Sequence, residues 1–223
     1  MADNYSMRSR VFNRLREDIL TGKYKKNDEL REAAIGEELG VSRTPVREAL
    51  HQLELEGLVE IIPNRGAYVV GITSADVEDI YMIRARLEGL CARLAAERVS
   101  TEQMGEMEEI LMLSRFHEEK KHYSQLFELD SRFHEVLFAS CGSKILEHVL
   151  DDFHHYIQMV RKRSLTVENR AEKATKEHEA IYAAIKSHDG DKADELATLH
   201  IMNARKNMKN HNLGNILDKN VLD

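Results

Sequence analysis

The stretch that decides the fold lies at residues 40–50 and reads GVSRTPVREAL. Val46 and Ala49 begin an apolar stripe at the spacing of a helix with one buried face. Ser42 stands where an N-cap residue is expected. Pro45 falls in the first turn, where proline is tolerated because its missing N–H group would have no helical partner there. The stretch predicts a short turn followed by an amphipathic helix.

The polar side of this helix carries short hydroxyls and arginines near its N-terminus. Ser42 and Thr44 suit contacts with phosphate, and Arg43 and Arg47 suit the paired acceptors on the edge of guanine. The alternative interpretation is an ordinary surface helix with solvated arginines. The neighbouring segments distinguish a DNA-binding helix from this alternative.

Those neighbours predict a helix-turn-helix with a β-hairpin wing. Residues 33–39 form a compact helix with Gly40 at its C-terminal end. Two short apolar strands are expected at 59–62 and 67–70, and the turn residues PNRG at 63–66 join them. A helix followed by a second helix and a hairpin is typical of a DNA-binding module.

The three segments GVSRTPVREAL, LELEGLV and NRGAYV together resemble the winged-helix domain of GntR-family bacterial transcription regulators, over residues 8–71. One departure is the segment before the first motif helix, which reads KKND at 25–28 where the family usually has a Pro-Gly turn. The resemblance implies that operator DNA is contacted by six residues of the helix and wing: Ser42, Arg43, Thr44, Arg47, Arg65 and Gly66.

Composition sets limits on the class of protein. The 223 residues suit one or two domains, and no apolar run approaches the length of a membrane span. The start of the sequence shows no charged-then-apolar pattern of a signal peptide. Cys91 and Cys141 are expected to be reduced core thiols, so a cytoplasmic protein is expected. The net charge of −7 gives no support for nucleic-acid binding, which therefore depends on the motif alone.

The remainder of the chain predicts helices only. Beyond residue 74 there is no proline and no strand-like alternation. The expected fold is mainly α: an N-terminal winged helix-turn-helix with a small hairpin wing, then a C-terminal all-α antiparallel helical bundle. The domain boundaries are a winged helix at 1–71, a linker at 72–75, an effector and dimerisation domain at 76–210 and a loose tail at 211–223. The expected helices of the bundle are 75–97, 101–116, 120–140, 143–163, 167–187 and 191–210.

Four ionisable side chains are expected to point into this apolar bundle. Asp130 and His134 lie one turn apart on a face rich in Leu and Phe. His178 and His200 each lie about 11 residues from Asp189, in a predicted hairpin, which sets them level at about 16 Å from the turn. Imidazole and carboxylate together suit Zn²⁺ best, with Ni²⁺, Mn²⁺ or Fe²⁺ as alternatives. For any single one of these histidines, a hydrogen-bonded core residue is the alternative interpretation.

The whole arrangement resembles the FadR subgroup of GntR regulators whose effector domain is of the FCD type. The segment DIYMIRARLE at 79–88 matches the start of that domain, and the metal-site residues fit its pattern over about 75–208. Arg84 faces inward, where it either pairs with an acid such as Glu88 or grips the carboxylate of an effector. Arg86 points elsewhere, to a structural or interface role. Of the remaining histidines, His155 is the one expected to line the cavity.

These observations predict a ligand-responsive repressor. It would bind palindromic double-stranded operator DNA as a homodimer, without a membrane or an enzymatic activity, and a small carboxylate at the metal would modulate binding. Two alternatives stay open. One is a metalloenzyme acting on a small acid or ester, and the other is a pure metal-sensing regulator.

Overall fold

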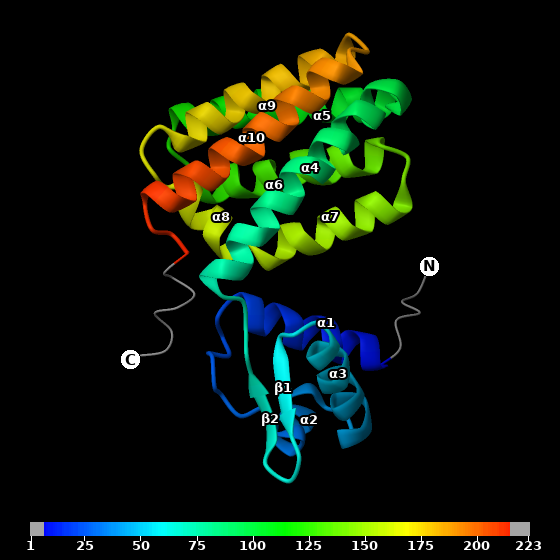
Figure 1. Cartoon of the computed structure of the whole chain (residues 1–223), viewed down its shortest axis with the longest axis vertical. Coiled ribbons are helices and arrows are strands. Elements are labelled where there is room, and N and C mark those ends of the chain that lie inside the picture. Colours follow the sequence, from blue (N-terminus) through cyan, green and yellow to red (C-terminus); the bar gives the residue numbers. More distant parts are fainter. Residues whose placement is uncertain (1–6, 215–223) are drawn as a thin grey trace. The chain divides into compact units, whose positions relative to one another are not determined.

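The computed structural model describes residues 7–214, and these fold as two units, residues 7–74 and 75–214 (Figure 1). The junction of the units falls at the predicted linker. The segment 1–6 and the part of the predicted tail at 215–223 lie outside the described residues. Residues 211–214 of that tail form a turn in which the side chain of Leu213 is buried, so this part of the tail is packed.

The first unit is a winged helix-turn-helix. Helix α3 buries Val46, Ala49, Leu50 and Leu53 and packs against α1. The two strands pair antiparallel, with Val59 opposite Val69 and Ile62 opposite Gly66. The elements are α1 (Met7–Leu20), α2 (Glu32–Leu39), α3 (Arg43–Leu55), β1 (Val59–Ile62) and β2 (Gly66–Val69).

Two glycines make the turn between α2 and α3 possible. Gly40 ends α2 at a φ of +65°, in the left-handed region where a side chain is costly. A Cβ atom on Gly36 would lie 2.9 Å from the carbonyl oxygen of Val41. The close approach of the two helices therefore requires glycine at 36, and it fixes how α3 is presented.

The second unit is all helical within residues 75–214, as the sequence predicts. Its core is built from the inward faces of α4, α5, α6, α7, α9 and α10. The elements are α4 (Ser74–Arg98), α5 (Thr101–Glu119), α6 (Tyr123–Ser140), α7 (Lys144–Tyr156), α8 (Gln158–Leu165), α9 (Arg170–Lys186) and α10 (Gly190–Asn210). No helix in the described part of the chain is both long enough and apolar enough to span a membrane.

The structure corrects three helix boundaries. The helix expected at 143–163 is two helices, with the break at Ile157. Helix α6 begins only at residue 123, because Lys121 adopts a positive φ of +56° that no helix continues through. Helix α9 begins at residue 170 for the same reason, since Asn169 has a φ of +61°. No proline or glycine marks these points in the sequence.

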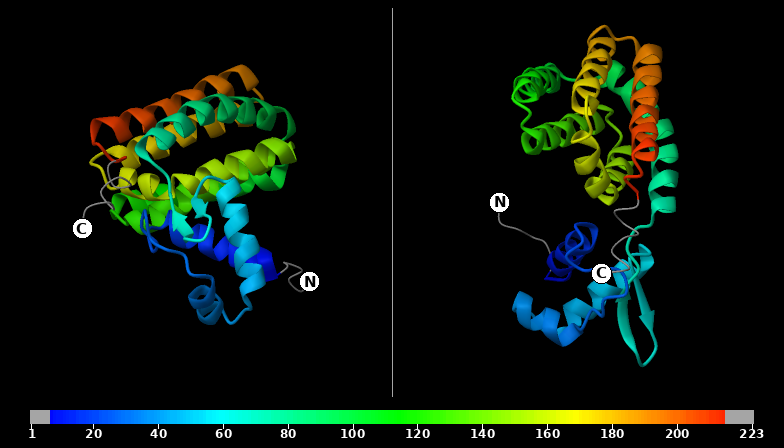
Figure 2. Two further views of the ribbon diagram at one scale, coloured as in Figure 1. Left: turned by 60° about the horizontal axis from the view of Figure 1, so that its bottom comes forward. Right: turned by 90° about the vertical axis from the view of Figure 1, so that its left-hand side faces the viewer.

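Five helices meet where the predicted metal residues lie. Helices α9 and α10 form an antiparallel hairpin, and α8 packs against α6 and α10 (Figure 2). Helix α4 approaches α10 so closely that a Cβ on Gly89 would clash with Asp194 and Thr198. Cys91 and Cys141 are buried free thiols, as expected.

Candidate metal centre and nucleic-acid interface

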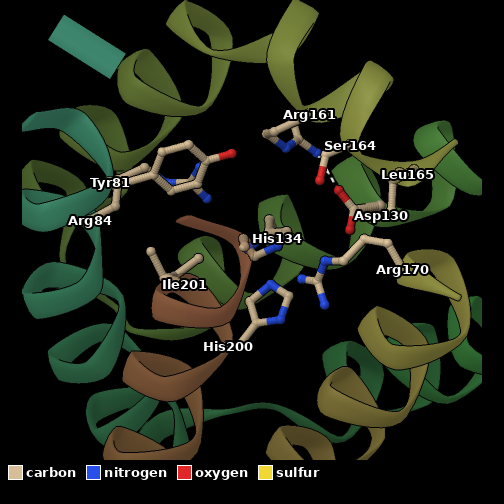
Figure 3. Close-up of a pocket in the computed structure, with 11 residues that line it drawn as sticks. Tyr81, Arg84, Asp130, His134, Arg161, Ser164, Leu165, Arg170, His200 and Ile201 are labelled. Atoms are coloured by element: carbon tan, nitrogen blue, oxygen red, sulfur yellow. Dashed lines mark hydrogen bonds and ion pairs between the residues drawn. The ribbon is translucent and has the colours of Figure 1, made fainter. Parts of the chain in front are cut away.

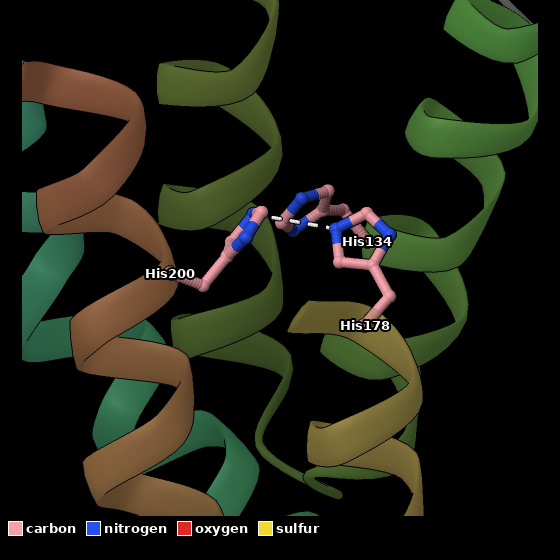
Figure 4. A group of neighbouring side chains, drawn as sticks. All are labelled: His134, His178 and His200. Atoms are coloured by element: carbon pink, nitrogen blue, oxygen red, sulfur yellow. Dashed lines mark hydrogen bonds between the residues drawn. The ribbon is translucent and has the colours of Figure 1, made fainter. Parts of the chain in front are cut away.

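Three buried histidines from three helices converge in the second unit. His134 comes from α6, His178 from α9 and His200 from α10, and each side chain is nearly inaccessible. One ring nitrogen of each lies within 4.8 Å of the others (Figure 4). Imidazoles brought together in an apolar interior need partners, because buried polar groups without them are destabilising.

The hairpin sets two of these rings level with each other. The Nε2 atoms of His178 and His200 are 3.3 Å apart, as the symmetric spacing about Asp189 predicts. Two imidazoles bound to one tetrahedral zinc, with metal–nitrogen bonds of about 2.0–2.1 Å, have their nitrogens about 3.4 Å apart. The observed separation therefore fits a shared divalent ion without movement of either helix.

Carboxylates hold the outer nitrogens of two rings. The Nδ1 atom of His200 lies 2.8 Å from Glu177, and that of His134 lies 3.0 Å from Glu88. The hydrogen bond to Glu177 fixes the His200 ring so that its other nitrogen faces the cluster, whereas the contact between Glu88 and Nδ1 of His134 is electrostatic and not a hydrogen bond. Burial alone would raise the pKa of Glu88, but Arg84 and His134 outweigh burial and hold it at about 2. The same competition, with His200 and Arg170 as partners, holds the pKa of Glu177 at about 2.

The third ring is positioned by stacking. His178 lies against Phe133 with ring centroids 4.2 Å apart and nearly parallel planes. Burial lowers the pKa of His178 well below its usual value, and burial lowers that of His134 as well. Neutral imidazole is the form that binds a metal. The fold therefore keeps both rings in the binding-competent state.

Asp130, the fourth predicted ligand, lies beside the histidine cluster, and its two carboxylate oxygens have different neighbours. Its Oδ1 atom is 3.8 Å from Nε2 of His178, and its Oδ2 atom accepts a bond of 2.5 Å from Arg161. Burial opposes ionisation of Asp130, yet Arg161 and His134 hold its pKa below the usual range. The carboxylate is thus ionised and has one oxygen turned toward the cluster.

A small cavity of about 30 Å³ opens beside the histidines (Figure 3). Asp130, His134 and His200 form part of its lining, and so do the three arginines Arg84, Arg161 and Arg170. Each arginine has a carboxylate partner: Glu88, Asp130 and Glu177 respectively. These six charges cancel, so a divalent ion among neutral imidazoles would leave the cavity positive and attractive to an anion.

Arg84 forms the internal ion pair that the sequence left open, and its contact with an effector stays a prediction. Its side chain is 1% exposed, and its Nε atom donates to Glu88 across 2.6 Å, so the internal ion pair exists. The residue also lines the cavity. Its Nη2 atom lies 3.4 Å from Nδ1 of His154.

The expectation for His155 is wrong. His155 is exposed and its Nδ1 atom lies 2.8 Å from the carbonyl of Asp151, whereas the neighbouring His154 is buried against His134. Successive residues of a helix point about 100° apart, so with His154 turned into the core of the unit, His155 points to solvent.

Several residues around the centre were missed from the sequence. The sequence alone does not identify Arg161, Arg170 or Glu177. Arg170 and Glu177 lie seven residues apart on one face of α9, a spacing that could have suggested their ion pair of 2.9 Å. No local signal could have joined Arg161 to Asp130, because the pair spans 31 residues.

In the first unit, the start of α3 presents its polar residues to solvent. Ser42, Arg43 and Thr44 are exposed, and Ser42 occupies the N-cap position, although its side chain makes no capping bond. Arg47 is also exposed and donates two bonds of 2.7 Å to Glu32 on α2. An exposed ion pair of this kind is weak, so a stronger acceptor can replace Glu32 at little cost.

The wing ends in a tight, tethered turn. Arg65 is exposed at its tip, and its carbonyl accepts a bond of 2.9 Å from the hydroxyl of Tyr68. Gly66 has a φ of +113°, which a residue with a side chain adopts only under strain. The turn therefore presents Arg65 on a fixed scaffold.

Comparison with known families identifies the chain. The sequence model of the FCD domain matches residues 79–203, and that of the bacterial regulatory proteins of the gntR family matches residues 7–69. The chain belongs to the GntR family and carries an FCD domain. It is therefore a transcriptional regulator of this type, with a helix-turn-helix unit for binding DNA.

Relatives of this GntR regulator extend over most of its length. The HTH-type transcriptional repressor RspR of Escherichia coli K12 is 29% identical over 199 residues, which cover 89% of this chain and 87% of the relative. YdhC of Bacillus subtilis 168, an uncharacterised HTH-type regulator, is 27% identical over 200 residues, 89% of either chain.

Solved structures share the fold of this GntR regulator. E. coli McbR/YncC has a TM-score of 0.72 at 22% identity, covering 93% of this chain and 99% of that one. A GntR regulator from Rhodococcus sp. RHA1 has a TM-score of 0.67 at 22% identity, covering 92% and 99%. At these identities the likeness establishes the fold alone.

Proposed function

We propose that this GntR-family regulator represses transcription in the cytoplasm by binding a palindromic operator as a homodimer, and that a small organic acid bound at a divalent metal releases it. The buried cluster of His134, His178 and His200, with carboxylates behind two of the rings, carries the proposal. Repression is favoured because relatives such as RspR are named repressors.

Operator contact is assigned to two exposed surfaces of the first unit. Arg43 and Arg47 read base edges, and Ser42 and Thr44 contact phosphate at the N-terminus of α3. Arg65 and Gly66 at the wing tip contact phosphate or the minor groove. The exposure of these side chains and the rigid turn of the wing support the assignment.

The metal is assigned to the three histidines, with Asp130 as the fourth ligand. Three imidazoles and one carboxylate suit Zn²⁺, with Ni²⁺, Mn²⁺ or Fe²⁺ as alternatives. Bound there, the ion supplies positive charge to a cavity whose own charges cancel. A small carboxylate effector then lies between the metal and Arg84, which stays paired with Glu88.

Release of the operator follows from the position of Arg84. The residue lies on α4, the helix that begins directly after the segment joining the two units. An effector that binds Arg84 changes the position of α4. Because the effector then contacts the operator-bound and the released conformations differently, it shifts the equilibrium between them.

The homodimer is supported by exposed apolar side chains on α4 and α10. Met82, Ile83 and Leu90 on α4 are each more than 40% exposed, and Leu199 and Met202 lie on the neighbouring α10. Exposed clusters of this kind mark protein interfaces. A two-fold axis near residues 82 and 83 would set Asp79 of one copy opposite Arg86 of the other, so the surface is complementary to a second copy of itself.

Two rivals are separated by simple measurements. A metalloenzyme would turn over small acids or esters. A pure metal sensor would change its DNA affinity on metal titration without any acid. The positive charge of a metal-loaded cavity favours an acid at the site over a pure metal sensor, and the gntR-family unit favours a regulator over a metalloenzyme.

The test is a metal analysis joined to an operator-binding assay. Purified protein should hold about one divalent ion per chain, and His178→Ala should lose it. His148→Ala, an exposed histidine on α7, is the matched control and should keep it. On an operator selected from a randomised DNA pool, short carboxylates should release the metal-loaded protein. Wild-type metal affinity in His178→Ala would refute the assignment of the site.

A further inference from the structure

Two histidines outside the buried cluster also face each other, at the junction of α5 and α6. His117 lies in the last turn of α5, and His122 stands at the N-cap of α6. Their Nδ1 atoms are 3.1 Å apart on the surface of the second unit. The proposed function makes no use of this pair.

The backbone of the junction fixes this approach. The N–H group of His122 donates to the carbonyl of His117 across 3.0 Å, and that of Lys121 donates to the carbonyl of Glu118 across 2.9 Å. These two bonds, formed around Lys121 with its φ of +56°, are the Schellman closure of a helix. The closure sets the first and last of these residues side by side, where two apolar side chains usually meet. In this chain both positions are histidine.

The surroundings order one ring and leave the pair open to solvent. Phe116 lies edge-on to the His117 ring, with ring centroids 5.2 Å apart and planes at 83°. His117 is half-buried, whereas His122 is exposed. An ion can therefore reach the two Nδ1 atoms directly from water.

A shared hydrogen bond is the other state that this pair can adopt. One neutral ring would donate its Nδ1–H group to the Nδ1 atom of the other. Such a bond between solvent-exposed groups contributes little, because water competes for both nitrogens. When the donating ring changes to the tautomer with its proton on Nε2, both Nδ1 lone pairs become free for a metal.

The separation of the two nitrogens favours one coordination geometry. With metal–nitrogen bonds of about 2.0–2.1 Å, two imidazoles lie about 3.4 Å apart at a tetrahedral centre and about 2.9 Å apart in neighbouring positions of a square plane. The observed 3.1 Å is nearer to the second value. Square-planar and tetragonal nitrogen sites are typical of Cu²⁺ and Ni²⁺, and Cu²⁺ is the stronger binder of the two.

Water would complete the coordination of an ion at this pair. Within residues 7–214, the buried cluster is the only group of three close metal-binding side chains, so no third one joins His117 and His122. Two protein ligands hold an ion less tightly than three or four. The pair is therefore expected to fill only with added metal, after the buried cluster.

We propose that His117 and His122 form a surface site for Cu²⁺, separate from the buried histidine cluster. The ion lies between the two Nδ1 atoms and ties the end of α5 to the start of α6. Neither residue lines the cavity beside the buried cluster, so this site is independent of the proposed function.

The experiment titrates the full chain with Cu²⁺ against a competing chelator, after loading with Zn²⁺ and removal of excess zinc. Zinc that remains on the protein is measured alongside, which separates binding at the pair from exchange at the buried cluster. The proteins are wild type, His117→Ala, His122→Ala and His148→Ala. His148 is the matched control, since it is an exposed histidine of the same unit with the carboxylate of Asp152 3.8 Å away.

Wild type should bind one Cu²⁺ and keep its zinc. Removal of either ring of the pair should weaken copper binding by about 100-fold, because the remaining ring no longer acts as half of a preformed chelate. His148→Ala should bind copper as wild type does. Copper should raise the melting temperature of wild type but not that of His117→Ala or His122→Ala.

Three results would overturn the inference. Wild-type copper affinity in His117→Ala or in His122→Ala would show that the two rings do not share an ion. A lower melting temperature of both metal-free variants, with copper binding equal in all proteins, would make the pair a hydrogen bond that closes the turn. Release of one zinc for each copper bound would place the copper in the buried cluster. If the chain takes up no zinc, only the proposed function fails, because the comparison between the variants is unaffected.

Discussion

Replacement of Glu177 should weaken metal binding without touching a metal ligand. Its Oε2 atom receives bonds from His200 Nδ1 at 2.8 Å and from Arg170 at 2.9 Å, and its Oε1 atom receives one of 2.8 Å from Asn203. A carboxylate behind a ligating imidazole orients the ring and raises its basicity. Loss of such a partner typically costs 10–100-fold in metal affinity, about 1.4–2.8 kcal/mol.

The bonding pattern indicates where in this range each variant falls. In Glu177→Gln the amide oxygen can still accept from His200 and Arg170, and Asn203 can turn its own oxygen to the new NH₂ group. The geometry then survives and only the charge is lost, so the effect should be about tenfold. Glu177→Ala removes both, and about 100-fold is expected.

The assay is a competition titration of Zn²⁺ against a chromophoric chelator. Glu179→Gln is the matched control, because Glu179 lies on the same helix and pairs with Arg115 away from the cavity. It should bind zinc as wild type does. If Glu177→Ala lowers the melting temperature while its zinc affinity stays at the wild-type value, Glu177 is only an ion-pair partner and its proposed role behind His200 is wrong.

Three further predictions concern the DNA, the ion pair and the dimer. Arg47→Ala should lose about 1–3 kcal/mol of binding free energy on the selected operator and relax specificity at one base pair per half-site, as measured by fluorescence anisotropy. An equal loss on random DNA would show that Arg47 contacts only the DNA backbone. Arg84→Ala leaves Glu88 buried without its cation, so the protein should lose about 3–5 kcal/mol of stability in denaturant titration, and an unchanged midpoint would contradict the buried pair. Ile83→Glu should give monomers in light scattering while metal content stays normal; a persistent dimer would exclude this face of α4.

The sequence by itself determined the first unit almost completely. Its signals are local: Gly40 ends one helix, Pro45 lies in the first turn of the next, and a turn joins two short strands. Each element of a helix-turn-helix lies next to its partner along the chain, so local periodicity and turn residues suffice. The level placement of His178 and His200 also followed from the sequence, because a tight hairpin fixes the register of its two helices.

Only the tertiary structure decided how the second unit is completed. The break at Ile157 and the left-handed Lys121 and Asn169 carry no proline or glycine, so packing rather than local preference produces them. Arg161 reaches Asp130 across 31 residues. A burial pattern tells which face of a helix points inward, but not which neighbour it meets, since that depends on how separate helices pack. For this reason the three histidines, Asp130 and the Arg84–Glu88 pair could be read from the sequence, whereas the partnership of Arg161 with Asp130 could not.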